Sequence, residues 1–410
     1  MTAHWTRALL LSAACLMASG AQAAPADAAL APYVAALRAA PDPATFVNRK
    51  LEQHDVLIFD DGLHSAKDPW QFYIQLVRNP EFASKVGYIF LEVAPLNHQP
   101  LIDAWMDGKA SDEQLLPLFQ DASDMGWALT TYLDLLKAVR EANAGKPAER
   151  RMRVIATDMP ATYPLQRTHQ DWEQSRLSGT ARDYHMYSVV KEVMGDFKQG
   201  RKGILLTNTR HAYKGIRNSK GQFYWNAGTF FSQHSPGKSY SLRVHAPILF
   251  IKKRGEGKAA TREGLDNVEY RWVRMEKGLW DSAFDAAGGM PKAVELAGTP
   301  FGKASYLGNH MLDAAPGQTI ADAYDAVIFP GPLDQYQASG TFDIYTPAFK
   351  RELKRRIEMI DSPEQQAGTV KQYGSIEAFV DAVFKPKPDR PDPIVKMLPP
   401  KDEWKADAAK

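Results

Sequence analysis

The sequence predicts an α/β fold with a central, largely parallel sheet flanked by helices. Three observations lead to this prediction. Short apolar runs that are typical of buried strands alternate with longer segments of helical periodicity. Four of these runs are followed directly by polar, chemically reactive side chains. The chain has 410 residues, of which 44 % are hydrophobic, so it is long enough to bury a sizeable core.

The N-terminus has the pattern of a secretory signal peptide over residues 1–23. Arg7 precedes an apolar run that extends to about Ala21, and residues 21–23 read Ala-Gln-Ala, a small-x-small cleavage site. This run is shorter than the roughly 20 residues that span a bilayer. We therefore expect an exported protein, periplasmic or secreted, with no stable membrane insertion. A lipoprotein processing site at Cys15 is the weaker alternative.

Cysteine content and charge exclude several classes of function. Cleavage after Ala23 would remove Cys15, the one cysteine, and with it a thiol nucleophile or a disulfide framework. Fifty basic residues against 48 acidic ones give a net charge of +2, so no overall field attracts nucleic acid or an anionic membrane. We expect a small-molecule partner, and the sequence leaves the oligomeric state open.

The strand and helix patterns follow one another along residues 24–384, which we expect to form one α/β domain. Strands are expected at 54–59, 86–93, 153–158, 203–207, 240–244, 247–252, 270–273 and 326–329. Helices are expected at 28–39, 69–78, 112–119, 125–142, 181–198, 351–360 and 375–384. Asp68, which precedes Pro69, is the expected N-cap of its helix. Residues 385–410 are rich in proline and charge, which predicts an extended tail that packs little.

Polar side chains follow the first four strands at the point where each strand ends. Because the carboxyl ends of parallel strands meet at one edge of a sheet, we expect an active-site cleft there. Glu92 lies in a run that should be buried, so its carboxylate needs polar partners. The candidate residues, in strand order, are Asp61 and His64, Glu92, Asp158, and Asn208, Arg210 and His211.

This set of side chains is suited to acid–base chemistry. A histidine beside a carboxylate is a general base, and we expect His64 to have this role. His211 or Arg210 could stabilise an oxyanion. The sequence has no Gly-x-Ser-x-Gly motif, so water activated by His64 is the simplest mechanism. For Asp158 alone, a helix cap or a turn is the alternative role.

The order of these motifs resembles the erythromycin esterase-like family, within the wider group that includes ChaN-like haem-binding proteins and Tiki-type metalloproteases. The resemblance extends from about residue 56 to residue 329. Its matching segments read DGLH at 61–64, FLE at 90–92, IATD at 155–158, RDYHM at 182–186, NTRH at 208–211 and YDAVI at 324–328. The resemblance implies an α/β fold with a cleft in which a histidine activates water against an ester or lactone.

Carried over by position, the resemblance makes His64 the base, Asp61 and Glu92 its orienting carboxylates, and His211 a second polar group of the site. Arg182 and Asp183 would support the cleft as an ion pair on the long helix.

The sequence also departs from the family pattern. Asp61 stands where the family has glutamate, Ser65 where glycine is usual, and Tyr73 where many members have arginine. Hydrolysis of macrolides is therefore not implied.

The alternative function is a periplasmic haem- or metal-binding protein of the ChaN-like type, without hydrolase activity. The hydrolase mechanism needs no cofactor, but His64, Glu92 and His211 could bind a divalent ion. An axial haem ligand could come from Tyr184, His185 or Met186. Aromatic residues between the strand ends could form an amphipathic wall for a ligand, namely Tyr163, His169, Trp172, Tyr184, Tyr213, Tyr224 and Trp225.

Overall fold

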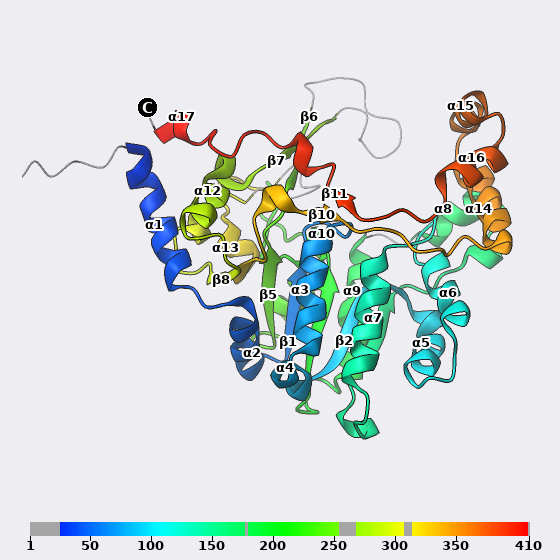
Figure 1. Cartoon of the computed structure of the whole chain (residues 1–410), viewed down its shortest axis with the longest axis horizontal. Coiled ribbons are helices and arrows are strands. Elements are labelled where there is room, and N and C mark those ends of the chain that lie inside the picture. Colours follow the sequence, from blue (N-terminus) through cyan, green and yellow to red (C-terminus); the bar gives the residue numbers. More distant parts are fainter. Residues whose placement is uncertain (1–24, 177–178, 254–267, 307–313, 409–410) are drawn as a thin grey trace, which may run out of the picture.

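A seven-stranded sheet forms the centre of the protein (Figure 1). The structure is a computed structural model that describes residues 25–176, 179–253, 268–306 and 314–408. The expected signal peptide lies outside these residues. The strand order is β3-β2-β4-β1-β5-β9-β8. The strands are β1 (Val56–Asp60), β2 (Val86–Pro95), β3 (Arg153–Asp158), β4 (Lys202–Thr207), β5 (Ser239–Val244), β8 (Lys292–Glu295) and β9 (Ala326–Phe329).

Neighbouring strands of this sheet are parallel except at the β8–β9 edge, where they are antiparallel. Strands β1 and β2 are buried along their whole length, as expected for a parallel sheet that is covered on both faces. The expected α/β fold with a largely parallel sheet is therefore confirmed.

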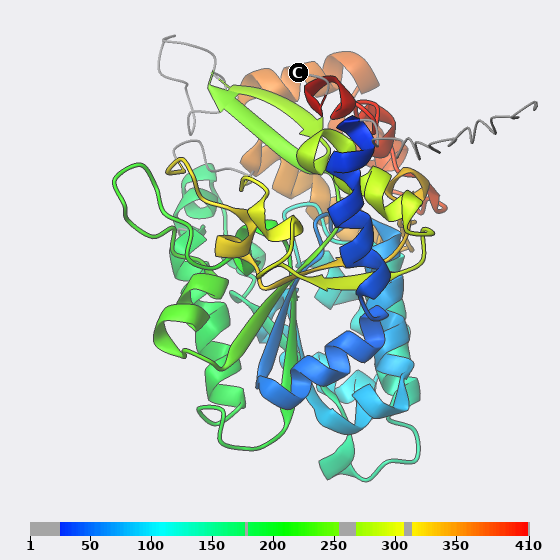
Figure 2. The ribbon, with the colours of Figure 1, turned by 90° about the vertical axis from the view of Figure 1, so that its left-hand side faces the viewer.

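Helices cover both faces of the sheet. Successive residues of each strand point to opposite sides, so each strand contributes side chains to a core on either face. In β1, Leu57 and Phe59 pack in one core, whereas Val56 and Ile58 pack in the other. Figure 2 shows the strands between the two helical layers. The first layer comprises α2 (Pro43–Gln53), α3 (Lys67–Arg78), α4 (Pro80–Lys85), α5 (Gln99–Met106), α6 (Asp112–Gln120) and α7 (Thr130–Ala142). Helices α14 (Pro347–Ile360) and α16 (Ile376–Val383) share this core but lie beyond the edge of the sheet (Figure 1). The second comprises α1 (Pro25–Ala39), α9 (Gly179–Val193), α10 (Thr209–Ala212), α11 (Ala227–His234), α12 (Leu279–Ala286) and α13 (Ile320–Ala323).

Three expected details of the helices are wrong. The seventh helix begins at Thr130 rather than at residue 125, because Gly126 adopts a left-handed φ of 80° that a helix cannot continue through. Helix α9 ends at Val193, before left-handed residues at 195–197. The N-cap of α3 is Ala66, and the carboxylate of Asp68 instead accepts a hydrogen bond from the backbone N–H of Gln337 at 2.8 Å.

The remaining elements lie around this core. Strands β6 (Ile248–Lys253) and β7 (Val268–Val273) form a separate antiparallel hairpin, and β10 (Gln337–Ala338) pairs with β11 (Arg390–Pro391). Helices α8 (His169–Ser175), α15 (Pro363–Tyr373) and α17 (Lys405–Ala408) complete the fold. Within the described ranges, no helix is both long enough and apolar enough to cross a bilayer.

The last segment, residues 385–408, is extended and mostly exposed, and it is anchored to the rest of the protein at a few points. We call this segment the C-terminal strap. It runs from α16 past β10 to α17, which contacts α1 (Figure 1). Leu63, Val395 and Leu398 pack against one small buried cluster of Ala66, Leu333 and Tyr336. Trp404 is buried, and its indole N–H donates to Ser282. These few apolar anchors fix the course of a segment whose composition is mainly polar.

Candidate active site

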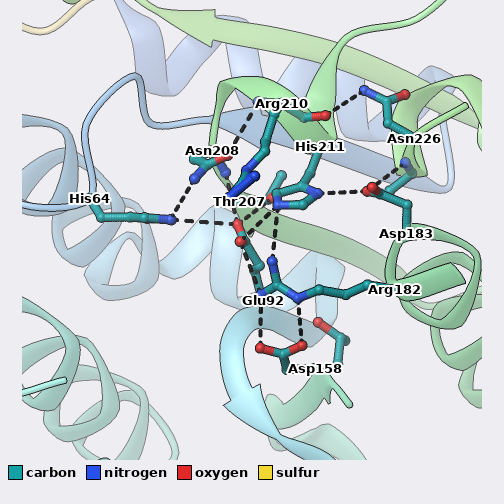
Figure 3. A network of polar contacts seen from close by, with 12 residues as sticks. His64, Glu92, Asp158, Arg182, Asp183, Thr207, Asn208, Arg210, His211 and Asn226 are labelled. Atoms are coloured by element: carbon teal, nitrogen blue, oxygen red, sulfur yellow. Dashed lines mark hydrogen bonds and ion pairs between the residues drawn. The ribbon is translucent and has the colours of Figure 1, made fainter. Parts of the chain in front are cut away.

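The carboxyl ends of β1 to β4 bring the expected polar side chains into one connected network (Figure 3). Asp61 and His64 follow β1, Glu92 lies within β2, Asp158 ends β3, and Asn208 and His211 follow β4. Helix α9 contributes Arg182 and Asp183. Arg210 joins the network through its backbone alone.

His64 is held by the loop that follows β1. Its Nδ1 lies 2.8 Å from Oδ2 of Asp61 and 3.0 Å from the hydroxyl of Tyr132. Gly62 makes this turn possible, because its φ is +69° and a Cβ atom would lie 2.3 Å from that of Ala246. Asp61 is fully buried and the His64 side chain is 15 % exposed, so the imidazole is shielded from water but still accessible.

The other ring nitrogen of His64 faces the interior of the network. Its Nε2 lies 2.9 Å from Nδ2 of Asn208 and 3.7 Å from Oε2 of Glu92. Asn208 uses its Oδ1 to accept from the backbone N–H of Arg210, so its amide donates to His64. This arrangement assigns the lone pair to Nε2 and the proton to Nδ1, where it is donated to Asp61. Burial lowers the pKa of His64, but Asp61 and Glu92 outweigh it and raise the pKa above its ordinary value.

Glu92 is the centre of the network and is 2 % exposed. Its Oε2 accepts from the hydroxyl of Thr207 at 2.6 Å and from the backbone N–H of Asn208 at 3.0 Å. Its Oε1 lies 3.1 Å from Nε2 of His211 and 3.3 Å from Nη2 of Arg182. Burial alone raises the pKa of Glu92, but the neighbouring cationic groups hold the pKa well below its usual range. The side chain of Glu92 is therefore in its ionised, carboxylate form at neutral pH.

His211 is a cation rather than a base. Its Nδ1 lies 2.7 Å from Oδ1 of Asp183, while its Nε2 faces Glu92. Burial lowers the pKa of His211, but these two carboxylates outweigh it and raise the pKa to about 9. Both ring nitrogens then carry protons at neutral pH.

Arg182 and Asp183 do not pair with each other, contrary to the expectation from the resemblance. Arg182 forms a bidentate pair with Asp158, with both N···O distances at 2.7 Å, and Asp183 pairs with His211. Consecutive residues on a helix point in different directions, so each finds a separate partner. Burial lowers the pKa of Arg182, whereas Asp158 and Glu92 raise it, with a net increase.

A second buried cluster beneath the loop was not predicted as a unit. The carboxylate of Asp60 accepts from the hydroxyls of Tyr324 at 2.6 Å and Thr209 at 2.9 Å, and from Arg243 at 3.0 Å. It also accepts from the backbone N–H of Gly62 at 2.8 Å. The sequence signal was an arginine inside an apolar strand, a residue that needs a buried partner. Tyr132 and Thr207 were missed as well, because neither carries a charge.

A cleft of about 980 Å³ opens beside the network. Arg182, Asp183, Arg210 and His211 line it from the network side, whereas His64 and Glu92 are not among the described residues that line it. Of the expected aromatic wall, only two members line the cleft. Tyr163 and Trp172 do so and donate to Asp124, whereas Tyr213 is core and Tyr184, Tyr224 and Trp225 lie elsewhere.

The candidate metal ligands His64, Glu92 and His211 have partners within the protein, whereas Nε2 of His185, a candidate haem ligand, is buried without a hydrogen-bond partner in the described residues. In the described part of the chain, no group of three histidine, cysteine, aspartate or glutamate side chains is arranged to hold a metal ion. His211 would have to leave two carboxylates to offer a lone pair. Met186 is fully buried in the core, and Tyr184 is 53 % exposed.

Several solved structures have a similar fold. A histidine-to-asparagine mutant of erythromycin esterase EreC in its open conformation is 10 % identical, with a TM-score of 0.48, and the match covers 70 % of this chain and 93 % of that one. A succinoglycan biosynthesis protein is 8 % identical, with a TM-score of 0.50 and coverage of 74 % and 96 %. A protein from Bacillus cereus is 11 % identical, with a TM-score of 0.45 and coverage of 75 % and 99 %.

The match at a TM-score of 0.50, to the succinoglycan biosynthesis protein, agrees with the α/β fold of this chain. At these identities the likeness concerns the fold alone. No family model and no curated protein matches the sequence.

Proposed function

We propose that the protein is an exported hydrolase that cleaves an ester or lactone bond with water activated by His64. The observation that carries this proposal is the contact of 2.8 Å between His64 and Asp61. It fixes the tautomer in which Nε2 has the lone pair. Export rests on the signal-peptide pattern of residues 1–23.

The reaction begins when a water molecule replaces the amide of Asn208 as the partner of His64 Nε2. Nε2 takes a proton from the water, whose oxygen forms a bond to the carbonyl carbon of the ester. Asp61 stabilises the resulting imidazolium, as a carboxylate does in a catalytic triad. The tetrahedral intermediate then collapses, its bond to the leaving oxygen breaks, and this oxygen receives the proton from Nε2.

The released amide of Asn208 is next to Nε2 and can donate to the oxyanion that develops in this step. His211 and Arg182 lie on the far side of Glu92, which holds both of them.

The test measures initial hydrolysis rates for a panel of esters and lactones with the wild-type protein and His64→Ala, each with and without EDTA. Turnover that vanishes in His64→Ala and survives EDTA is the expected result. His169→Ala, which changes an exposed histidine outside the network, is the control and should retain wild-type rates. Turnover that EDTA abolishes would replace this mechanism by a metal-assisted one. No turnover by the folded wild-type protein would favour the haem- or metal-binding alternative.

A further inference from the structure

The acidic residues of the cleft are already engaged within the protein. A ligand that enters the cleft therefore meets carboxylates whose hydrogen-bonding capacity is in use. The partners are Arg182 for Asp158, His211 for Asp183, Arg356 for Asp121, His169 for Glu173, and Tyr163 and Trp172 for Asp124.

Arg210 differs from these residues because its charge is available. Its backbone is fixed at both ends, since its N–H donates to Oδ1 of Asn208 at 3.2 Å and its carbonyl accepts from Nδ2 of Asn226 at 2.9 Å (Figure 3). Its side chain is exposed and lines the cleft. Across the described ranges of the chain, the guanidinium has no hydrogen bond or ion pair. A firmly anchored residue thus presents its side-chain donors to the cleft.

The other arginines of the cleft have contacts within the protein. Arg182 forms two hydrogen bonds with Asp158. Arg176 lies over the ring of Trp172, with its central carbon 4.8 Å from the ring centroid, and its Nη1 is 4.0 Å from Asp124. Arg210 has neither kind of contact in the described part of the chain, and it is the arginine that lies beside the catalytic network with its donors available.

We propose that Arg210 binds a carboxylate group of the substrate, so that the protein prefers esters that carry a carboxylate at a second position. A planar guanidinium matches a carboxylate with two parallel hydrogen bonds. The single positive charge of Arg210 balances the single negative charge of a carboxylate, whereas a phosphate group would need further donors. Asn208 and His211 are the neighbours of this residue, so a ligand anchored there lies next to the catalytic network. This inference rests on the proposed hydrolase function.

The kinetic test uses two substrates that differ only in charge, 4-acetoxybenzoate and 4-acetoxybenzamide. For Arg210→Gln, we expect the KM for 4-acetoxybenzoate to rise at least about tenfold, because a charge-assisted pair is lost. The kcat for this substrate and both constants for the amide should stay within about twofold. Arg176→Gln removes the same charge from the same cleft and is the matched control, with KM within about twofold. Equal changes for the two substrates, or no change for either, would overturn the proposal.

A binding measurement separates this proposal from the hydrolase function. Calorimetry with 4-methoxybenzoate and 4-methoxybenzamide, which contain no ester, should show at least about tenfold tighter binding of the carboxylate by wild-type protein. Arg210→Gln should lose this preference, and Arg210→Lys should retain part of it. If the protein hydrolyses neither acetate but shows this preference, the carboxylate site stands and the hydrolase function fails. If wild-type protein shows no preference, the carboxylate site is refuted whether or not hydrolysis occurs.

Discussion

The guanidinium of Arg182 lies 3.1 Å from Nε2 of His211, so two groups that both pair with Glu92 also contact each other inside the protein. Glu92 makes this contact stable, because its Oε1 is within 3.3 Å of both groups. On the sides that face away from Glu92, Arg182 pairs with Asp158 and His211 pairs with Asp183. The network is therefore an alternation of carboxylates and cations, in which the removal of one charge leaves its neighbours unbalanced.

Replacement of the central carboxylate tests this alternation. Glu92→Gln keeps the shape of the side chain but leaves Arg182 and His211 without their shared anion. We expect the free energy of unfolding to fall by about 3 kcal/mol, as measured by urea denaturation near pH 7. Glu173→Gln, which removes a carboxylate from an exposed pair with His169, should change it by less than about 0.5 kcal/mol. Similar values for the two variants would refute the central role of Glu92.

The pKa of His211 makes stability depend on pH. This pKa is about 9 in the folded protein, against an ordinary value of about 6.5 in the unfolded chain. A raised folded-state pKa gives stabilisation that is complete below about pH 6.5 and is lost as the pH rises through about 9. On this basis wild-type protein should lose on the order of 3 kcal/mol of unfolding free energy that His211→Gln does not lose.

The measurement is urea denaturation of wild-type protein and His211→Gln from about pH 6 to about pH 9.5. The difference between the two curves isolates the contribution of His211 from that of other groups. His169→Gln should follow the wild-type curve. Parallel curves for wild-type protein and His211→Gln would mean that His211 is not a buried cation.

Asp61 sets the pH at which His64 becomes an active base. Its carboxylate contributes to the raised pKa of His64, so Asp61→Asn should lower that pKa. The acidic limb of kcat/KM against pH should therefore move to lower pH, while the plateau falls by about 100-fold because the tautomer is no longer fixed. Asp107→Asn, which alters an exposed carboxylate paired with Lys109, should leave both features unchanged. An acidic limb that does not move in Asp61→Asn would argue against the dyad.

The packing of the C-terminal strap is testable at its one tryptophan. Trp404 is 5 % exposed, and its backbone N–H donates to the carbonyl of Lys277. We expect Trp404→Ala to lower the free energy of unfolding by about 3 kcal/mol, because a large buried side chain is lost. Met397→Ala changes a neighbour in the same segment that is 60 % exposed, and its effect should be below about 0.5 kcal/mol. Equal effects of the two substitutions on the free energy of unfolding would mean that burial of Trp404 does not hold the strap in place.

The strands and the members of the site were predictable for a shared reason. Buried parallel strands are continuous apolar runs, and the polar residue that ends such a run is conspicuous, as at Asp158 and Asn208. Because parallel strands end at one edge, their final residues were expected to meet. Strand β8 escaped prediction, since Lys292–Glu295 has only 4 residues and is charged at both ends.

Pairing within the network was much less predictable. The partner of Arg182 on helix α9 proved to be Asp158 at the end of β3, and the partners of Asp60 come from segments that are distant in the sequence. Such contacts depend on strand order, which local patterns do not encode. The anchoring of the strap was not predictable for a different reason, because its average composition is polar and a few residues such as Trp404 decide its position.

The loop that carries His64 shares an apolar cluster with a segment far along the chain, since Leu63, Val395 and Leu398 pack against the same three buried residues. A ribosome therefore completes the loop long before it makes Val395 and Leu398. We expect a chain truncated before Val395 to retain its strands and helices while its histidine loop is loose. Maturation of the site thus waits for the segment that completes this cluster.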